Sequence, residues 1–326
     1  MKNKKVFVTG AGGFIGSHLV EKLVESGADV TALVKYNSMN RWGCIDLFRE
    51  DVRKKIKIIS GDLMDVDFLR KNMKDLDVVF HLGALISIPY SYEAPRHYFE
   101  NNVIGTLNVM EAAKGKGIKK VIHTSTSEVY GTPDKVPIKE DFLLKGQSPY
   151  SASKIGADKV AESFYYSFDL PVLILRPFNT YGPRQSARAI IPSIIAQALE
   201  GKQIVMGNPE PTRDFNFVYD TVDAFIRAAK SNVIGETINV GTGIETSILE
   251  LTEMIKKIVN QDTKIVYDPN RYRPNKSEVM RLCADNSKAK KLLNWAPKHS
   301  LKEGLKITAR WVNENPNFYK TNIYNI

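Results

Sequence analysis

The feature that most constrains the fold is a glycine-rich turn between a short apolar strand and a helix. Val6–Thr9 has the pattern of a buried strand, and an amphipathic helical pattern follows Gly16. Gly10, Gly13 and Gly16 have the spacing GxxGxxG, which permits a tight turn, close approach of the backbone to a ligand, and close packing of helix on strand. A pyrophosphate at the N-terminus of such a helix meets free N–H groups and a favourable dipole. The turn therefore predicts a dinucleotide-binding site.

Apolar β-branched runs alternate with helical patterns through the first half of the chain. Continuous apolar strands between helices indicate a parallel sheet covered on both faces, so we expect an α/β, doubly wound (Rossmann) fold with a smaller C-terminal lobe. The expected strands are Val6–Thr9, Val30–Val34, Ile56–Ser60, Val78–Leu82, Val121–Thr124 and Val172–Leu175. The expected helices are Gly16–Glu25, Val66–Lys71, Tyr98–Gly115, Tyr150–Ser167, Ile248–Val259, Ser287–Leu293 and Leu301–Val312.

After about Arg176 the rhythm changes to a proline-punctuated, loop-rich stretch. We expect residues 1–176 to form the NAD(P)-binding domain, with segments near 214–243 returning to it. Residues 177–213 and 244–326 are expected to form the substrate-binding lobe. No linker separates the two parts, so they should share a cleft.

Composition and charge exclude several other classes of protein. The chain has two cysteines, Cys44 and Cys283, and no CxxC pair, so we expect neither a disulfide framework nor a metal site. The net charge of +10 comes from dispersed lysines, without an arginine-rich arm, and does not predict nucleic-acid binding. No apolar run is long enough to span a membrane, and the N-terminus lacks the apolar stretch of a signal peptide. We therefore expect a cytoplasmic protein.

The choice between NAD and NADP depends on the end of the second strand. NAD sites commonly have an acidic residue there for the adenosine ribose, whereas this chain has Lys35 followed by Tyr36. A lysine suits a 2′-phosphate, but NADP sites often present more than one basic group. The prediction is NAD, with NADP as the alternative. Asp62, after the third strand, is placed either to meet the adenine or to cap the next helix.

A tyrosine and a lysine four residues apart open the helix after the fifth strand. Tyr150 and Lys154 share one helix face, and an ammonium group beside a phenol favours the phenolate, so Tyr150 is expected to act as a base near neutrality. Thr126 lies in a hydroxyl-rich segment at the carboxyl end of the fifth strand, where ligands of parallel sheets bind. It is expected to hydrogen-bond the hydroxyl that Tyr150 deprotonates.

Four segments resemble the extended short-chain dehydrogenase/reductase family, and the resemblance covers nearly the whole chain. They are Thr9–Gly16, Thr126–Gly131, Tyr150–Lys154 and Arg176–Pro183. The resemblance implies an enzyme that oxidises C4 of a nucleotide-diphosphate sugar and regenerates its cofactor in the same turnover. It also implies a homodimer that pairs through the helix of Tyr150 and its neighbour.

Glu128 distinguishes between activities within this family. By resemblance, 4-epimerases have a neutral residue at this position, whereas 4,6-dehydratases have a glutamate that removes the C5 proton. Ser125–Gly131 and Gln147–Lys159 are similar to 4,6-dehydratases of bacterial nonulosonate (legionaminic and pseudaminic acid) pathways, which implies a UDP- or GDP-N-acetylhexosamine as substrate. Ser127 stands where dTDP-glucose 4,6-dehydratases have Asp, so Glu128 is expected to act as base and then as acid.

The main prediction is therefore a sugar-nucleotide 4,6-dehydratase. A C5-epimerase of the 4-keto-6-deoxy product, a UDP-glucuronate decarboxylase and a sugar-nucleotide 4-epimerase remain open.

The resemblance also implies a set of site residues, although each arginine among them could instead form a surface salt bridge, and Ser87 could cap a loop. The catalytic residues would be Thr126, Ser127, Glu128, Tyr150 and Lys154. The cofactor contacts would be Gly10, Gly13, Phe14, Ile15, Gly16, Lys35, Asp62, Leu63, Leu82, Ala84, Asn102, Tyr150, Lys154 and Pro177. The substrate contacts would be Ser87, Thr126, Asn179, Arg184, Arg188, Arg213, Arg273 and Glu278.

Overall fold

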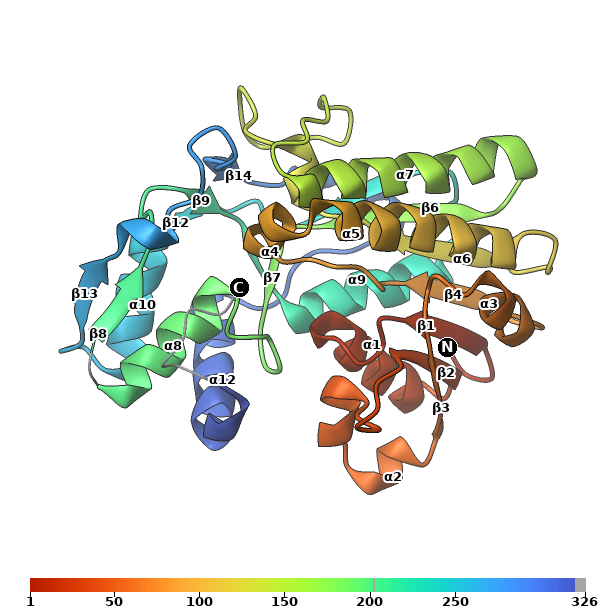
Figure 1. Ribbon diagram of the computed structural model, residues 1–326, viewed down its shortest axis with the longest axis horizontal. Helices are drawn as coiled ribbons and strands as arrows, with labels where there is room; N and C mark the ends of the chain where they lie inside the picture. The colour runs from red at the N-terminus through yellow and green to blue at the C-terminus, as the bar shows by residue number, and fades with distance from the viewer. Residues whose placement is uncertain (202, 320–326) are drawn as a thin grey trace.

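The main sheet contains the expected strands and is parallel throughout. The computed structural model describes residues 1–201 and 203–319 (Figure 1). Seven strands lie in the order β11-β6-β5-β4-β1-β2-β3, and all neighbouring pairs run parallel. The order reverses between β1 and β4, and ligands of open parallel sheets bind at the carboxyl ends of the strands beside such a point. The bounds are β1 Lys5–Thr9, β2 Asp29–Lys35, β3 Ile56–Gly61, β4 Val78–His81, β5 Lys120–Thr124, β6 Val172–Pro177 and β11 Thr237–Val240.

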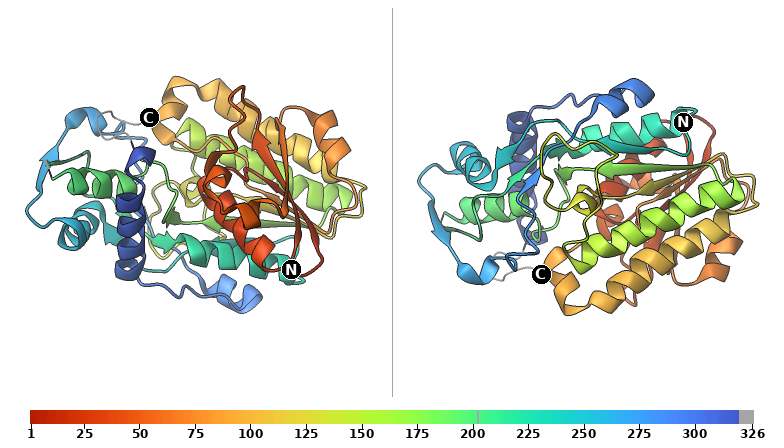
Figure 2. Two further views of the ribbon diagram at one scale, coloured as in Figure 1. Left: turned by 90° about the horizontal axis from the view of Figure 1, so that it is seen from below. Right: turned by 90° about the horizontal axis from the view of Figure 1, so that it is seen from above.

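Helices cover both faces of this sheet, which confirms the doubly wound prediction. One face carries α3 (Val66–Asn72), α5 (Pro95–Phe99), α6 (Gly105–Ala113) and α7 (Pro149–Phe168), and the other carries α1 (Phe14–Glu25), α9 (Val218–Lys230) and α11 (Ser287–Leu293) (Figure 2). Short helices η1 (Gly43–Leu47), α2 (Glu50–Arg53), α4 (Ile88–Glu93) and η3 (Ser127–Tyr130) lie in the connections.

The helix expected over 98–115 contains a π turn that the sequence did not predict. The turn, η2, spans Glu100–Ile104 and joins α5 to α6. It carries Asn102, which is buried and hydrogen-bonded to segments outside the helix. Such turns often occur at functional sites.

The stretch after Arg176 is less loop-rich than expected. It contains the strand β7 (Asn179–Tyr181) and the helix α8 (Ile190–Glu200), in which Pro192 lies in the first turn, where proline is tolerated. The helix α8 packs with α10 (Ile248–Val259) and α12 (Leu301–Glu314), and these form the smaller lobe seen at the left of Figure 1. The remaining elements are β8 Gln203–Met206, β9 Thr212–Arg213, β10 Phe215–Phe217, β12 Thr246–Ser247, β13 Lys264–Tyr267, η4 Pro269–Arg271, β14 Arg281–Leu282 and η5 Pro316–Phe318.

The two parts of the chain share one apolar core. A single cluster of buried side chains runs from Val6 and Val8 in β1 to Ile255 in α10 and Leu305 in α12. The segment from α9 to β11 returns to the main sheet, whereas the division at residue 176 stays a prediction. None of the helices within residues 1–201 and 203–319 has the length and apolar character that spanning a membrane requires.

Candidate active site

Gly10 and Gly16 in the turn after β1 leave no room for a side chain. Gly10 has a φ of +67°, and a Cβ there would come within 2.8 Å of the backbone of Gly83. A Cβ on Gly16 would lie 2.1 Å from the carbonyl oxygen of Gly10. Among the described residues, no side chain caps α1 at Gly13, so the first amides of the helix, those of Phe14 and Ile15, have no side-chain acceptor there. This arrangement suits the pyrophosphate of a dinucleotide.

The residues at the end of β2, where an adenosine ribose is expected, are exposed. Lys35 is exposed, and the side chain of Tyr36 is 68% exposed. Asp62 is also exposed, and its Oδ1 accepts a hydrogen bond of 2.9 Å from the amide of Met64. The residue that caps α3 is Asp65, so Asp62 is not the cap of the next helix.

The loop after β4 is fixed by two side chains. The amides of Leu82 and Gly83 donate to Thr9 Oγ1 at 3.1 and 3.0 Å. Asn102 accepts from the amide of Leu85 and donates to its carbonyl oxygen, at 2.8 and 3.0 Å, and also donates to Ser153 Oγ. The side-chain amide of Asn102 therefore holds the loop against the start of α7.

Of the other predicted cofactor contacts, Leu82 and Ala84 belong to this loop, and Leu63 lies against its Gly83. Leu63 is buried, Leu82 and Ala84 are partly buried, and Pro177 lies at the carboxyl end of β6.

The helix α7 begins at the proposed base because of a capping box. Ser148 Oγ accepts from the amide of Ser151, and the Ser151 hydroxyl accepts from the amide of Ser148. Pro149 is the first helical residue, where its fixed φ suits the helix. Tyr150 is therefore placed in the first turn, and the ring of Tyr98 lies edge-on against it, with ring centroids 6.2 Å apart.

The pKa of Tyr150 is governed chiefly by burial, and the effect of Lys154 on it stays a prediction. Burial raises the pKa of Tyr150 above its usual range, and a hydrogen bond with Thr126 opposes this rise. Lys154 Nζ donates to the carbonyl oxygen of Thr124 in β5, at 2.7 Å. Burial lowers the pKa of Lys154 to about 8, and Asp158 opposes this shift.

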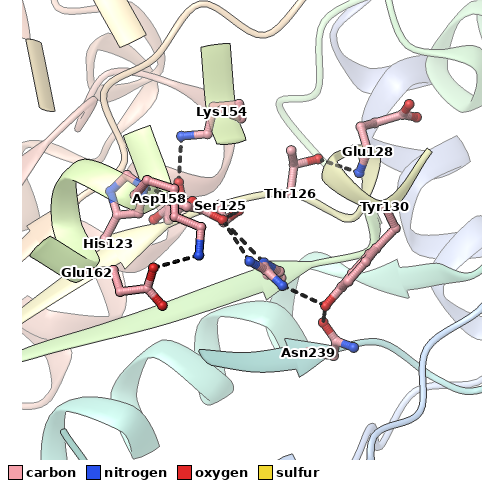
Figure 3. Close-up of polar contacts among 12 residues, drawn as sticks. His123, Ser125, Thr126, Glu128, Tyr130, Lys154, Asp158, Glu162 and Asn239 are labelled. Atoms are coloured by element: carbon pink, nitrogen blue, oxygen red, sulfur yellow. Dashed lines mark hydrogen bonds and ion pairs between the residues drawn. The ribbon is translucent and has the colours of Figure 1, made fainter. Parts of the chain in front are cut away.

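Glu128 is buried in the structure but makes few hydrogen bonds. Its amide donates to Thr126 Oγ1 at 3.3 Å, which caps the short helix η3. Within the described part of the chain, its carboxylate accepts no hydrogen bond and forms no ion pair. Figure 3 shows this carboxylate directed away from the hydrogen-bonded groups around Tyr130. Ser127, beside it, is buried.

Three of the predicted substrate residues form one charged cluster. Arg213 Nη2 and Arg273 Nη1 lie 3.2 and 3.3 Å from Glu278 Oε1. Burial lowers the pKa of Arg213, and the charge of Glu128 opposes this shift, which places Glu128 near the cluster. The sequence did not identify Tyr92 of α4, whose hydroxyl lies 2.7 Å from Ser277 Oγ and within electrostatic range of Glu128. Only the fold shows that these distant segments meet.

The other predicted substrate residues are dispersed. Arg184 forms an ion pair of 2.8 Å with Glu21 of α1 and lies over the ring of Phe48, so its guanidinium contacts the lobe that carries the glycine turn. Arg188 is exposed and bonds weakly to Ser186. The buried Oδ1 atom of Asn179 has no hydrogen-bond partner among the described residues.

Ser87, the last of these residues, precedes α4, and its side chain does not cap that helix. Nowhere in residues 1–201 and 203–319 do three or more His, Cys, Asp or Glu side chains gather in a way that could hold a metal ion.

Comparisons with known proteins agree on a family and differ on activity. Residues 7–308 match the family model described as GDP-mannose 4,6 dehydratase. The chain is 35% identical to UDP-glucose 4-epimerase of Mycolicibacterium smegmatis, over 94% of this chain and 98% of that protein.

Two solved structures have similar folds. UDP-N-acetylglucosamine 4-epimerase from Methanobrevibacter ruminantium M1, in complex with UDP-N-acetylmuramic acid, has a TM-score of 0.88 and 36% identity, and the match covers 97% of this chain and 100% of that chain. DesIV, a dTDP-glucose 4,6-dehydratase from Streptomyces venezuelae, was solved as a double mutant with NAD bound. It has a TM-score of 0.86 and 28% identity, and the match covers 96% of this chain and 98% of that chain. The similarity to enzymes of nonulosonate pathways stays a prediction.

Proposed function

The chain belongs to the family of NAD-dependent sugar-nucleotide epimerases and dehydratases, within the extended short-chain dehydrogenase/reductases, and we propose that it is a 4,6-dehydratase. The single observation that carries this proposal is the buried Glu128 carboxylate, which accepts no hydrogen bond from the described residues and lies near Arg213 and Tyr92. A carboxylate without a structural partner is available to take a proton from a substrate carbon.

The residues present fit NAD. The turn from Gly10 to Gly16 would hold the pyrophosphate, and the loop fixed by Thr9 and Asn102 would line the adjoining part of the cofactor site. When bound, NAD supplies the acceptor for the C4 hydride and later returns that hydride, and the positive charge of its oxidised ring favours the phenolate of Tyr150.

Tyr150, Thr126 and Lys154 would carry out the proton transfer at C4. Tyr150 takes the proton of the C4 hydroxyl, and Thr126 holds the same oxygen by a hydrogen bond. Lys154, whose pKa is about 8, stays mostly protonated at neutral pH and stabilises the phenolate by its charge. Oxidation to a ketone then makes the proton on the neighbouring C5 acidic.

Glu128 would carry out the elimination. Its carboxylate takes the C5 proton, and the electron pair of the C5–H bond forms a double bond between C5 and C6. The C6–O bond breaks, and the hydroxyl leaves as water with a proton from Glu128. Glu128, now a carboxylate again, takes up a proton from solvent and delivers it to C5 as the hydride returns to C6, which gives a 4-keto-6-deoxy sugar.

The names of the relatives favour a second candidate, a sugar-nucleotide 4-epimerase. Two of the three proteins compared above are 4-epimerases, including the one with the higher identity among the solved structures. Such an enzyme would use Tyr150, Thr126 and Lys154 in the same way and would have no need of a base at C5. Glu128 is the residue that separates the two candidates.

The test is product analysis with a panel of UDP-, GDP-, dTDP- and CDP-sugars. We expect a UDP- or GDP-N-acetylhexosamine to lose the mass of water, and Glu128→Gln to keep C4 oxidation but form no 4-keto-6-deoxy product. Glu162→Gln, which changes a partly exposed carboxylate of α7, is the control and should convert substrate like the wild type. A C4-inverted sugar of unchanged mass would support the 4-epimerase instead, and loss of CO₂ from a uronate would support a decarboxylase.

We also propose that the protein is a homodimer. Large apolar side chains are exposed on the surface of α5, η2 and α7, among them Phe99, Ile104, Tyr166 and Phe168. Exposed apolar patches of this kind mark interfaces between protein chains. A light-scattering mass of one chain at micromolar concentration would contradict this proposal.

A further inference from the structure

A buried carboxylate lies behind the Tyr150–Lys154 pair. Asp158 follows Lys154 by one helical turn and Tyr150 by two, so the three residues share one face of α7. Its side chain is 2% exposed. The sequence did not identify Asp158 as a functional residue.

Asp158 is bound by two neighbouring strands (Figure 3). From β5 and the residue after it, His123 Nε2 lies 3.1 Å from Oδ1, and the Ser125 hydroxyl donates to Oδ2 at 2.6 Å. From β6, Arg176 donates to Oδ2 through Nε and Nη2, at 3.2 and 3.1 Å. Burial lowers the pKa of His123, so the ring is neutral at pH 7 and carries its proton on Nε2, since the carboxylate can only accept.

The hydrogen bonds of Asp158 lie on both sides of Thr124, the residue that binds Lys154. His123 and Ser125 stand on either side of Thr124, whose carbonyl oxygen accepts the hydrogen bond from Lys154 Nζ. The Asp158 carboxylate therefore fixes the residue before Thr124 and the residue after it. Since Ser125 precedes Thr126, the carboxylate also fixes the segment that leads to Thr126.

Asp158 also carries a charge that counteracts the effect of burial on the pKa of Lys154. Among the described residues, it is the only group that raises the pKa of Lys154 against the effect of burial. Burial would raise the pKa of Asp158 itself, but His123, Arg176 and Lys154 keep it below its usual value, so the carboxylate is ionised at neutral pH. The other titratable groups around the pair are Tyr150 on α7, Tyr98 on α5, His81 on β4, His123 on β5, Glu128 on η3 and Arg176 on β6.

We propose that Asp158 is a positioning residue of this site: it holds the end of β5 against α7 and keeps Lys154 protonated. The inference rests on the proposed roles of Tyr150 and Lys154 and names the residue that sets the upper pH limit at which they work. A purely structural role would change the amount of folded enzyme and leave that limit unchanged.

The test compares Asp158→Asn with the wild type in two assays. In the first, the rate of sugar-nucleotide conversion is measured against pH. Loss of the negative charge should move the alkaline limit of kcat to lower pH by about one unit. In the second, the free energy of unfolding is measured against pH in proteins with Lys154 and with Lys154→Met. The pH at which Lys154 loses its proton should fall by a similar amount in the Asp158→Asn background.

Two further variants keep the test decisive. Glu162→Gln removes the next carboxylate along α7, which is partly exposed and paired with Lys159, and should move neither pH value. If Asp158→Asn fails to fold because Arg176 is left unpaired, then Asp158→Asn with Arg176→Met removes both buried charges and should show the same downward shift.

An unchanged alkaline limit and an unchanged Lys154 titration in these variants would overturn the proposal. The unfolding measurement needs no substrate, so it decides the role of Asp158 even if the proposed reaction is wrong. If no sugar nucleotide is converted by the wild type, that failure concerns the proposed function alone.

Discussion

Replacing Lys154 with methionine removes a buried ammonium group and keeps a side chain of similar shape. Lys154 is buried, and its Nζ donates to the carbonyl oxygen of Thr124. We expect this variant to be inactive and yet more stable than the wild type at pH 7. Gain of stability with loss of activity would mark Lys154 as a group retained for function.

The size of the effect follows from the pKa of Lys154. It falls from 10.5 in the unfolded chain to about 8 in the folded protein. Since one pKa unit corresponds to about 1.4 kcal/mol, the charged lysine costs the folded protein about 3 kcal/mol at neutral pH. Methionine also loses the hydrogen bond to Thr124, which is worth about 1 kcal/mol. The net gain for Lys154→Met at pH 7 is therefore about 2 kcal/mol.

The pH dependence has a definite sign. Between pH 8 and pH 10.5, the unfolded chain binds more protons at this site than the folded protein does. The free energy of unfolding of the wild type therefore rises with pH relative to that of the variant, and the advantage of methionine disappears over this window. Below pH 8 both states are protonated, so the advantage is constant.

The assay is urea denaturation of both proteins at several pH values from 7 to about 10.5, with matched m-values as the check on two-state behaviour. Lys159→Met is the control, because Lys159 is exposed and paired with Glu162, and its effect should stay within about 0.5 kcal/mol at every pH. A variant less stable than the wild type at pH 7, or a stability difference that does not change with pH, would refute the reasoning.

Three further predictions concern other parts of the site and fold. Gly16→Ala places a Cβ 2.1 Å from the carbonyl oxygen of Gly10, so it should abolish NAD binding measured by calorimetry, and wild-type affinity would contradict the assigned turn. Arg213→Gln removes a buried charge from the Glu278 cluster, so KM for the sugar nucleotide should rise by about tenfold with a smaller change in kcat, and an unchanged KM would contradict the prediction that Arg213 contacts the substrate. Ser300→Ala breaks the capping box of α12, so it should cost about 1 kcal/mol of stability in denaturant titrations and leave kcat unchanged, and loss of activity would show that this lobe is more tightly coupled to the site.

The sequence predicted the sheet well because its central strands, such as β4, β5 and β6, are buried on both faces. Strands of this kind are continuous apolar runs, and the expected run Val172–Leu175 differs from β6 only at its end. The helix with Tyr150 was equally clear, because serine and proline at its start define where it begins. These signals are local, so one sequence is enough to find them.

What the sequence could not predict depends on contacts between distant segments. The π turn around Asn102 is held by bonds to Leu85 and Ser153. The ion pair of Arg213 joins residues 65 positions apart, and the partner of Arg184 lies 163 positions away. Likewise, the depressed pKa of Lys154 comes from burial that only the assembled fold creates.

The central claim is that Glu128 breaks the C5–H bond of a sugar nucleotide, and deuterium incorporation tests it most directly. The substrate is converted in D₂O, and the early product is analysed by mass spectrometry and NMR. We predict a product that has lost water and carries one deuterium at C5, with no such product from Glu128→Gln. A product of unchanged mass, inverted at C4 and without deuterium at C5, would contradict it.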